Sequence, residues 1–250
     1  MTVAGRRLTA RAVLFDKDGT LIDLHAPWSS WAFALVDALR ERQPELPASP
    51  LHAALGVRDG RVEPDGALAG GTDAMITAAL TPVLSGAGIT DPAAEIARGV
   101  ARAHRAVDVD ALVQPLPGVQ AIVRECAALA DGVAVVTADT EERAWRHLAH
   151  IGVAEAVDVV VGADRVAHGK PDPEPVVLAC EELGVPPAAV VSFGDSTHDA
   201  LAAERAGIAH RVLVRPTEPD PSLQAVAWAR SWSQVTLRAG PGHRATSATR

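Results

Sequence analysis

The sequence predicts an α/β fold: a parallel β-sheet covered by helices on both faces, with a helical segment inserted after the first strand. Short apolar runs rich in valine recur along the 250 residues, and helical patterns separate the later runs. Such runs are typical of strands that are buried on both faces, and their alternation with helices is typical of a parallel sheet. The segment 24–116 interrupts the alternation, because it holds helical patterns and no convincing strand.

The first expected strand is Ala12–Phe15, which ends at a charged turn that contains glycine. Similar apolar runs extend the sheet at residues 133–136, 157–161, 190–193 and 211–214. The helical patterns that accompany them occupy residues 118–130, 140–151, 173–183 and 197–206. Beyond the last run, residues 225–229 are expected to form an edge strand and residues 231–237 a short helix.

The inserted segment has helical patterns at residues 27–40, 72–84 and 92–107. A connector rich in glycine, proline and aspartate, residues 43–71, lies between the first two. A proline-rich turn at residues 115–118 marks the return to the sheet. We therefore expect residues 1–23 and 117–238 to form the catalytic core, residues 24–116 to form a separate helical domain, and residues 239–250 to be a disordered tail.

The composition favours a folded, acidic protein. Of the residues, 48% are hydrophobic and the net charge is −8, so neither disorder nor a general attraction to nucleic acid or anionic membrane is expected. The two cysteines, Cys126 and Cys180, lie far apart in helical patterns and are expected to be buried free thiols. No signal peptide or membrane span is evident, and a cytoplasmic location is expected.

Residues with reactive or ligand-binding groups follow three of the expected strands. Asp16 and Asp18 follow the first strand, Thr137, Ala138 and Asp139 the second, and Asp195 and Asp199 the fourth. Lys170 lies in a loop before a helix. In a sheet of this type, ligands bind beyond the carboxyl ends of the strands. We therefore expect these side chains to converge.

The carboxylates of four of these residues cannot all stay ionised in one cleft without a counter-charge; the four are Asp16, Asp18, Asp195 and Asp199. A hard cation with oxygen ligands would supply it, and Mg²⁺ fits best, with Lys170 adding a second positive charge. Together they would neutralise a transferring phosphoryl group. Asp16 could then act as the nucleophile, while Asp18 could protonate the leaving oxygen and deprotonate the attacking water.

The four segments resemble the four motifs of the haloacid dehalogenase superfamily, in their usual order. The first is D-x-D-G-T-L at residues 16–21; the second is a strand-end Thr, Thr137; the third is a Lys before Pro, Lys170; and the fourth is G-D-S-x-x-D-x-x-x-A-x-x-A-G at residues 194–207. The sequence most resembles the phosphoglycolate-phosphatase-like branch, and residues 24–116 match the family's helical cap in position.

The resemblance implies a Rossmann-like core with a cap, and it implies catalytic roles. Asp16 would be the nucleophile, Asp18 the general acid and base, and Lys170 would orient Asp16 and the phosphoryl oxygens. Thr137 and the backbone N–H of Ala138 would bind phosphate.

The resemblance also implies the ligands of Mg²⁺. They would be the side chain of Asp16, the backbone carbonyl of Asp18 and the side chain of Asp195. Asp199 would not bind the metal directly but would act through a water molecule or Lys170.

The implied function is a Mg²⁺-dependent phosphatase that hydrolyses a small phosphomonoester, phosphoglycolate-like or a sugar phosphate, through an aspartyl phosphate. A phosphomutase would share every core residue. A non-hydrolytic binding protein would be expected to have lost the nucleophile or the lysine, and Asp18 disfavours a dehalogenase because halide leaves without a proton. The expected partner is a small phosphorylated metabolite, with no nucleic acid and no membrane; substrate identity and oligomeric state are left open.

Two residues depart from the family pattern. Lys17 is expected to be a solvated lysine, or else to face the cap or substrate and offset the acidic cluster. Asp139 stands where relatives often have Asn or Gly, and it is expected to point away from the phosphate or to cap the next helix together with Thr140. If Asp139 points inward, the substrate would carry a cationic or hydroxyl group.

In the inserted segment, Trp28, Trp31 and Phe33 are expected to pack the helices, and Arg58 and Arg61 are candidates to bind a substrate carboxylate. The histidines that flank the motifs, His25 and His198, are expected to be surface or packing residues.

Overall fold

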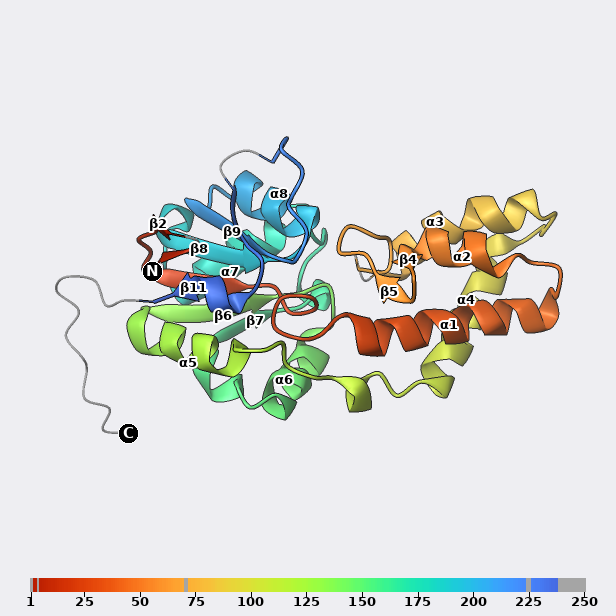
Figure 1. The fold of residues 1–250 in the computed structure, drawn as a ribbon, viewed down its shortest axis with the longest axis horizontal. Helices are drawn as coiled ribbons and strands as arrows, with labels where there is room; N and C mark the ends of the chain where they lie inside the picture. Colours follow the sequence, from red (N-terminus) through yellow and green to blue (C-terminus); the bar gives the residue numbers. More distant parts are fainter. Residues whose placement is uncertain (1, 4, 70–71, 224–225, 238–250) are drawn as a thin grey trace.

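A parallel sheet forms the centre of the larger of two bodies in the computed structural model, which describes residues 2–3, 5–69, 72–223 and 226–237 (Figure 1). Within these ranges its six strands run in the order β10-β9-β8-β3-β6-β7. They are β3 (Ala12–Phe15), β6 (Gly132–Val136), β7 (Val159–Val161), β8 (Val190–Gly194), β9 (His210–Val214) and β10 (Val226–Ala229). The expected strands are confirmed, the third beginning two residues late.

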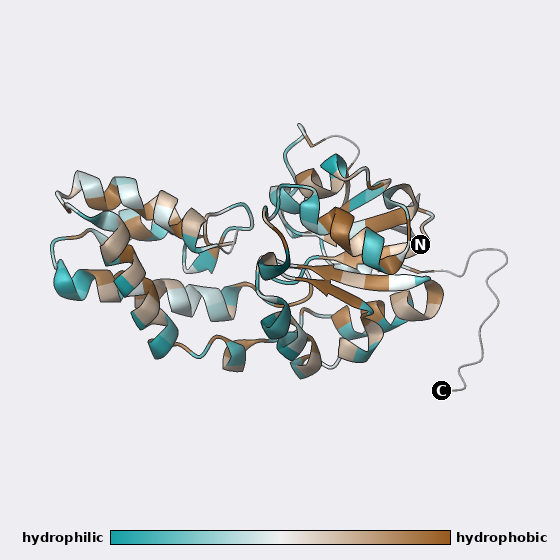
Figure 2. Cartoon of the chain, turned by 180° about the vertical axis from the view of Figure 1, so that it is seen from behind, coloured by the Kyte–Doolittle hydropathy of each residue, from teal (hydrophilic) through white to brown (hydrophobic). Residues whose placement is uncertain are grey.

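Helices cover both faces of this sheet, because the side chains of β3 alternate between two hydrophobic clusters. Val13 and Phe15 pack with α5 (Val119–Leu129) and α6 (Glu141–His150). Ala12 and Leu14 pack with α7 (Glu174–Leu183) and α8 (Thr197–Arg205). Figure 2 shows the brown strands enclosed by helices that carry teal, hydrophilic residues. The predicted α/β class is confirmed.

Both cysteines are buried and free, as expected: Cys126 lies in one cluster and Cys180 in the other. Burial raises the pKa of the Cys126 thiol to about 12 and that of Cys180 to about 11, so neither is a reactive thiolate.

The smaller body has its own hydrophobic cluster, built on residues such as Leu35, Leu51, Leu80 and Ile96. Its helices are α1 (His25–Arg42), α2 (Ala48–Leu55), α3 (Asp73–Gly86) and α4 (Pro92–Ala106), and a hairpin pairs β4 (Val57–Arg58) with β5 (Arg61–Val62). The connector expected at residues 43–71 is therefore wrong in part, because α2 and the hairpin lie within it. Both elements are too short for sequence periodicity to reveal, and the Asp59–Gly60 turn has positive φ at both residues.

The two connections between the bodies run side by side. Ile22 forms a β-bridge with Pro115, Asp23 N donates to Gln114 O at 2.9 Å, and Leu116 N donates to Leu21 O at 2.9 Å. The polypeptide thus leaves and re-enters the core at one place.

The C-terminal part of the core differs from the prediction. Instead of a helix over 231–237, a 3-10 turn (Trp232–Gln234) precedes β11 (Val235–Thr236), which pairs with β1 (Thr2–Val3), and β1 pairs with β2 (Arg6–Arg7). Residues 239–250, expected to be a tail, lie outside the described residues. None of the helices described is long and apolar enough to cross a membrane.

Candidate active site

Sheet order brings the predicted site residues together. Strand β3 lies between β8 and β6, so Asp16, Asp195 and Thr137 leave the same edge of the sheet from neighbouring strands. The backbone holds this alignment: Asp16 N donates to Phe193 O at 2.8 Å, just past the β3–β8 pairing. The expected convergence is found for Asp16, Asp195 and Asp199, but the side chain of Asp18, expected as a fourth carboxylate, does not join them.

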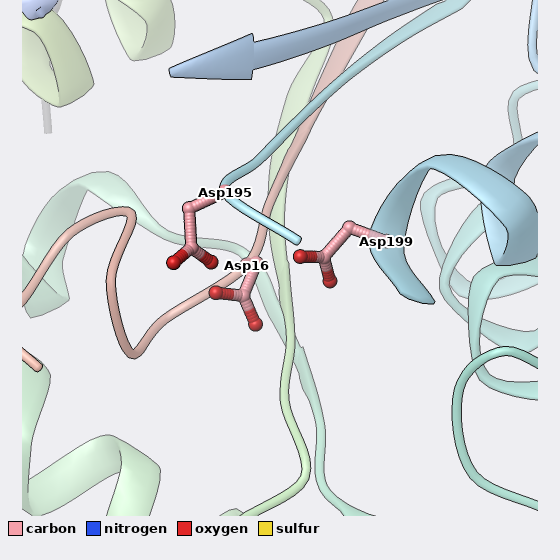
Figure 3. A group of neighbouring side chains, drawn as sticks. All are labelled: Asp16, Asp195 and Asp199. Carbon is pink, nitrogen blue, oxygen red and sulfur yellow. The ribbon is translucent and has the colours of Figure 1, made fainter. Parts of the chain in front are cut away.

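Three carboxylates form the centre of the site. Oxygens of Asp16, Asp195 and Asp199 lie within 4.8 Å of one another, and Figure 3 shows their carboxyl groups turned toward a common space. Two glycines permit this. Gly19 has φ +89°, and a Cβ on it would lie 2.1 Å from Asp195 Oδ2, while a Cβ on Gly194 would lie 2.3 Å from Asp199 Cβ. Neither position accepts a larger residue without displacing an acid.

Lys170 links two of these acids. Its Nζ donates to Asp16 Oδ1 at 2.6 Å, to Asp199 Oδ1 at 2.7 Å and to the Val136 carbonyl at 3.1 Å. The other oxygen of Asp199 accepts from Ser196 N at 3.1 Å and Ser196 Oγ at 2.6 Å, in a capping box at the start of α8. Because both oxygens of Asp199 are engaged, its position suits a role through Lys170 better than one as a metal ligand.

The cluster is short of positive charge. Burial, and then the charge of Asp199, raise the pKa of Asp16 to about 7 against the opposing effect of Lys170. Burial, and then Asp16 and Asp199, raise the pKa of Asp195 well above its usual range. Burial opposes the charged forms of Asp199 and Lys170 too, but the charge of Lys170 outweighs it and lowers the pKa of Asp199. The charges of Asp16, and then of Asp199, likewise outweigh it and raise the pKa of Lys170.

Buried oxygen donors with unbalanced negative charge are what a hard divalent cation requires. The residues present therefore fit Mg²⁺, with Asp16 and Asp195 as the carboxylates best placed to hold it.

The side chain of Asp18 is not part of this cluster. Its Oδ2 lies 2.6 Å from Lys17 Nζ, and its Oδ1 accepts a long hydrogen bond of 3.4 Å from Trp28 Nε1. Burial raises the pKa of Asp18, but Lys17 outweighs burial and the net effect lowers it. Asp18 is thus held as a carboxylate two residues after Asp16.

Lys17 is completely buried, with 0% exposure, so the expectation of a solvated lysine is wrong. Besides Asp18, its Nζ lies 3.2 Å from Asp139 Oδ2 and 3.0 Å from His147 Nδ1. The alternative expectation is confirmed only in part: Lys17 offsets the charges of Asp18 and Asp139, but the partners of its Nζ all belong to the core and not to the inserted segment. Asp139 follows its prediction in part: Oδ1 accepts from Thr140 N at 2.9 Å, while Oδ2 faces Lys17.

His147 was missed from the sequence. Burial, and then Lys17, lower its pKa, so the imidazole is neutral. Because the Lys17 ammonium only donates hydrogen bonds, Nδ1 accepts, and Nε2–H donates to Asp110 Oδ1 at 3.0 Å. The signal available was weak: a histidine four residues after Arg143 on an amphipathic helix, which most often means a surface position.

A cavity of 380 Å³ lies over the acidic cluster between the two bodies. Its core wall includes Asp16, Asp18, Thr137 and Lys170, and its wall from residues 24–116 includes Trp28. Trp28 was expected only to pack helices, and it lines this chamber as well. Trp31 packs as expected with 1% exposure and also lines the chamber, whereas Phe33 is 42% exposed and meets the His52 ring edge-on.

The two arginines proposed for a substrate carboxylate do not line this chamber. Arg58 pairs with Glu63 at 3.0 Å, and Arg61 lines a separate cavity behind Asp195. The two histidines that flank the motifs lie in different places: His198 lines the chamber, and His25 lines the separate cavity. The expectation of surface or packing histidines is therefore incomplete for His198.

One ion pair joins the smaller body to the side of the core that carries Asp195. Asp65, after β5, accepts from Thr197 N at 2.6 Å and from Arg215 Nη1 at 2.8 Å, and the same Nη1 donates to the Asp195 carbonyl at 3.0 Å. Burial raises the pKa of Asp65, but the hydrogen bonds from Thr197 and Arg215 outweigh it and hold the pKa below its usual value. The contact therefore holds above the ordinary range of an Asp carboxyl and is lost as the pH falls through its lowered pKa.

Asp65→Ala should weaken closure of the smaller body over the core. Because Asp65 is half exposed, we expect a loss of about three- to tenfold in kcat/KM on an aryl phosphate. Glu63→Gln is the matched control, since Glu63 contacts Arg58 within the same body. Small-angle scattering should show a more open chain for Asp65→Ala alone; equal profiles for the two variants would contradict a closing role.

Comparisons with known proteins agree with this geometry. A model of haloacid dehalogenase-like hydrolases matches residues 10–207. The chain is 31% identical over 204 residues to N-acetylmuramic acid 6-phosphate phosphatase of Pseudomonas aeruginosa, covering 81% of this chain and 80% of that protein. It is 32% identical over 225 residues to phosphoglycolate phosphatase of Rhodospirillum rubrum, covering 87% and 86%.

Among solved structures, one from Thermotoga maritima with a provisional assignment as a β-phosphoglucomutase superposes with a TM-score of 0.61 at 26% identity. The match covers 88% of this chain and 94% of that one. The sheet, the site and these matches agree, and the chain belongs to the haloacid dehalogenase-like hydrolases.

Proposed function

We propose that this hydrolase is a Mg²⁺-dependent phosphatase that cleaves a small phosphomonoester through an aspartyl phosphate on Asp16. The observation that carries the proposal is the placement of Asp16. Its Oδ1 is held by Lys170 at 2.6 Å, and Asp195 and Asp199 lie within 4.8 Å. The names of two relatives, both phosphatases, support the same reaction.

Asp16 would attack phosphorus with the oxygen that Lys170 does not hold, while the bond from phosphorus to the leaving oxygen breaks. Thr137 Oγ1 accepts from Asp139 N at 3.1 Å, which leaves its hydroxyl hydrogen free to donate to a phosphoryl oxygen. The Ala138 N–H has no hydrogen-bond partner among the described residues and can donate there as well. Bound Mg²⁺ would offset the negative charge that the phosphoryl group brings to Asp16 and Asp195.

Asp18 would manage the proton in both steps. Because Lys17 holds it as a carboxylate, Asp18 would take the proton of a monoanionic phosphate ester and pass it to the leaving oxygen. In the second step the Asp18 carboxylate would accept a proton from water as that water attacks phosphorus and frees Asp16. The cycle balances, with one ester and one water giving one alcohol and one phosphate.

An aryl phosphate assay with controlled metal tests the proposal. We expect hydrolysis of p-nitrophenyl phosphate to saturate with Mg²⁺, to stop with EDTA and to return when excess Mg²⁺ is added. Acid-quenched enzyme should carry a phosphoryl group that neutral hydroxylamine removes, as expected for an acyl phosphate. Hydrolysis that survives EDTA, or full activity without any such phosphoenzyme, would rule out the proposed chemistry.

A phosphomutase is the second candidate, favoured by the superposition on the Thermotoga maritima structure. Such an enzyme would pass the phosphoryl group from Asp16 to a second hydroxyl of a sugar instead of to water. Following a hexose 1-phosphate by ³¹P NMR separates the two, because a mutase gives the 6-phosphate and a phosphatase gives inorganic phosphate.

A further inference from the structure

The chamber extends well beyond the space that a phosphoryl group needs. Its volume of 380 Å³ is within the range of small-molecule sites. The wall from the smaller body is largely apolar and includes Trp28, Trp31, Leu68 and Ile76. A leaving group of two or three carbons would leave much of this space unfilled, whereas a sugar has both the size and an apolar face to pack there.

Fixed positive charge is scarce in this part of the chamber. Among the described lining residues, Lys170 and Arg143 carry permanent cations, and Lys170 is bound to Asp16 and Asp199. Arg143 Nε lies 2.7 Å from Asp110 Oδ1 and 3.7 Å from Asp139 Oδ2, so nearby carboxylates already balance its charge. An incoming carboxylate would find no unpaired cation.

The imidazole on the smaller body's side is a neutral hydrogen-bond donor. Trp31 Nε1 lies 3.2 Å from His104 Nδ1, and because an indole N–H only donates, His104 Nδ1 carries no proton. Burial, and then Arg143, lower the pKa of His104 and keep the ring neutral. Its Nε2–H suits a hydroxyl group. The second imidazole, His198, precedes Asp199 in α8 and so belongs to the phosphoryl end.

Asp73 adds a negative charge that nothing nearby balances. It is the first residue of α3, it is exposed, and it forms no ion pair within the described part of the chain. By contrast, Asp18 and Asp139 share the charge of Lys17. The leaving-group end of the chamber is thus net negative, and Asp73 is the carboxylate there that has no ion-pair partner among the described residues.

From these observations we propose that the leaving group is a hydroxyl-rich sugar or polyol, neutral or amine-bearing, and that Asp73 disfavours substrates whose leaving group carries a carboxylate. The inference rests on the proposed phosphatase function and specifies its substrate class. Phosphoglycolate and N-acetylmuramic acid 6-phosphate, the substrates in the names of two relatives, both carry a carboxylate and would be poor substrates here despite the shared family.

Matched pairs of phosphates test the charge directly. Glycerol 3-phosphate and 3-phosphoglycerate differ in CH₂OH against COO⁻, and sorbitol 6-phosphate and 6-phosphogluconate repeat that difference on a longer polyol. At pH 8 with saturating Mg²⁺, we expect kcat/KM to favour the hydroxyl member of each pair by about tenfold or more. Glucosamine 6-phosphate should be used at least as well as glucose 6-phosphate.

Asp73→Asn identifies the residue responsible. It should reduce the preference for hydroxyl over carboxylate by about three- to tenfold in both pairs, mainly through KM of the carboxylate member. Asp37→Asn is the matched control, since it removes one exposed negative charge from α1 outside the chamber. It should leave both ratios at their wild-type values.

The outcomes separate the two proposals. Equal or better use of the carboxylate members by the wild-type enzyme would overturn the inference, and so would an unchanged ratio in a folded Asp73→Asn. Failure to hydrolyse any phosphate, p-nitrophenyl phosphate included, would instead refute the phosphatase function. Should Asp73→Asn fold poorly, the wild-type pairs alone still decide the substrate class.

Discussion

Asp16→Asn should reduce kcat on p-nitrophenyl phosphate by at least about 10⁴-fold, because an amide neither attacks phosphorus nor forms an acyl phosphate. No phosphoenzyme should be trapped after acid quench. Asp131→Asn is the control: Asp131 is an exposed carboxylate paired with Arg11, next to the start of β6 at the opposite end of the sheet from Asp16. It should keep full activity.

The stability of Asp16→Asn separates a chemical role from a structural one. The folded pKa of Asp16 is raised from 3.8 to about 7, so its contribution to stability is fully present below the unfolded value and is lost as the pH rises through 7. Without metal at pH 8, the variant should therefore melt about 3–10 °C above wild type, and the gap should close at low pH. A Tm below wild type at pH 8 would show that the carboxylate is a structural requirement, and activity close to wild type would refute it as the nucleophile.

Asp18→Asn should have the second largest effect, a fall of about 10²–10⁴-fold in turnover of an alkyl phosphate. The loss should depend on the leaving group. With 2,4-dinitrophenyl phosphate, whose leaving group needs no proton, the first step should stay fast while the second lacks its base. We expect a burst of one dinitrophenol released per active site, followed by slow turnover. Phosphoenzyme should accumulate during the slow phase.

Asp16→Asn serves as the comparison, because it should show neither the burst nor the phosphoenzyme. If Asp18→Asn loses activity equally on alkyl and dinitrophenyl esters, its role is not proton transfer to the leaving group. Lys17 keeps Asp139 and His147 as neighbours in this variant, so the buried ammonium is not left alone.

The core of the site could be predicted because its residues follow directly after strands, and the order of parallel strands determines where those residues lie. Asp16 and Asp195 are the residues that follow two strands, and adjacent parallel strands place such residues side by side. The lysine before a proline could be matched only through the resemblance. Its hydrogen bond to Asp16 spans 154 positions in the chain, a separation about which local pattern says nothing.

Lys17 and His147 could not be predicted for the same reason. Lys17 is buried because the turn after β3 folds back, with Leu21 N and Ile22 N both donating to the Lys17 carbonyl at 2.8 and 3.0 Å. Its partner His147 lies 130 positions away on α6. From sequence alone, a lysine between two aspartates is expected to be exposed to solvent, and only the fold shows which residues cover it.

Specificity residues were the hardest to predict, because they depend on how the two bodies meet. Trp28 and Asp73 are unremarkable within their own helices, and their roles arise where they face Asp18 and the chamber. The arginines that looked suited to a substrate from the sequence, Arg58 and Arg61, lie at the hairpin and outside the chamber.

The adjacent connections at Ile22 and Pro115 have an evolutionary consequence. Since both ends of the inserted segment meet, it can lengthen, shorten or be exchanged for another module while every strand of the sheet keeps its neighbours. Under the proposed function, catalysis and much of the substrate choice would then be encoded in parts of the gene that can diverge at different rates. A chimaera that joins this core to a foreign insert at the bridge should inherit the chemistry of one parent and the selectivity of the other.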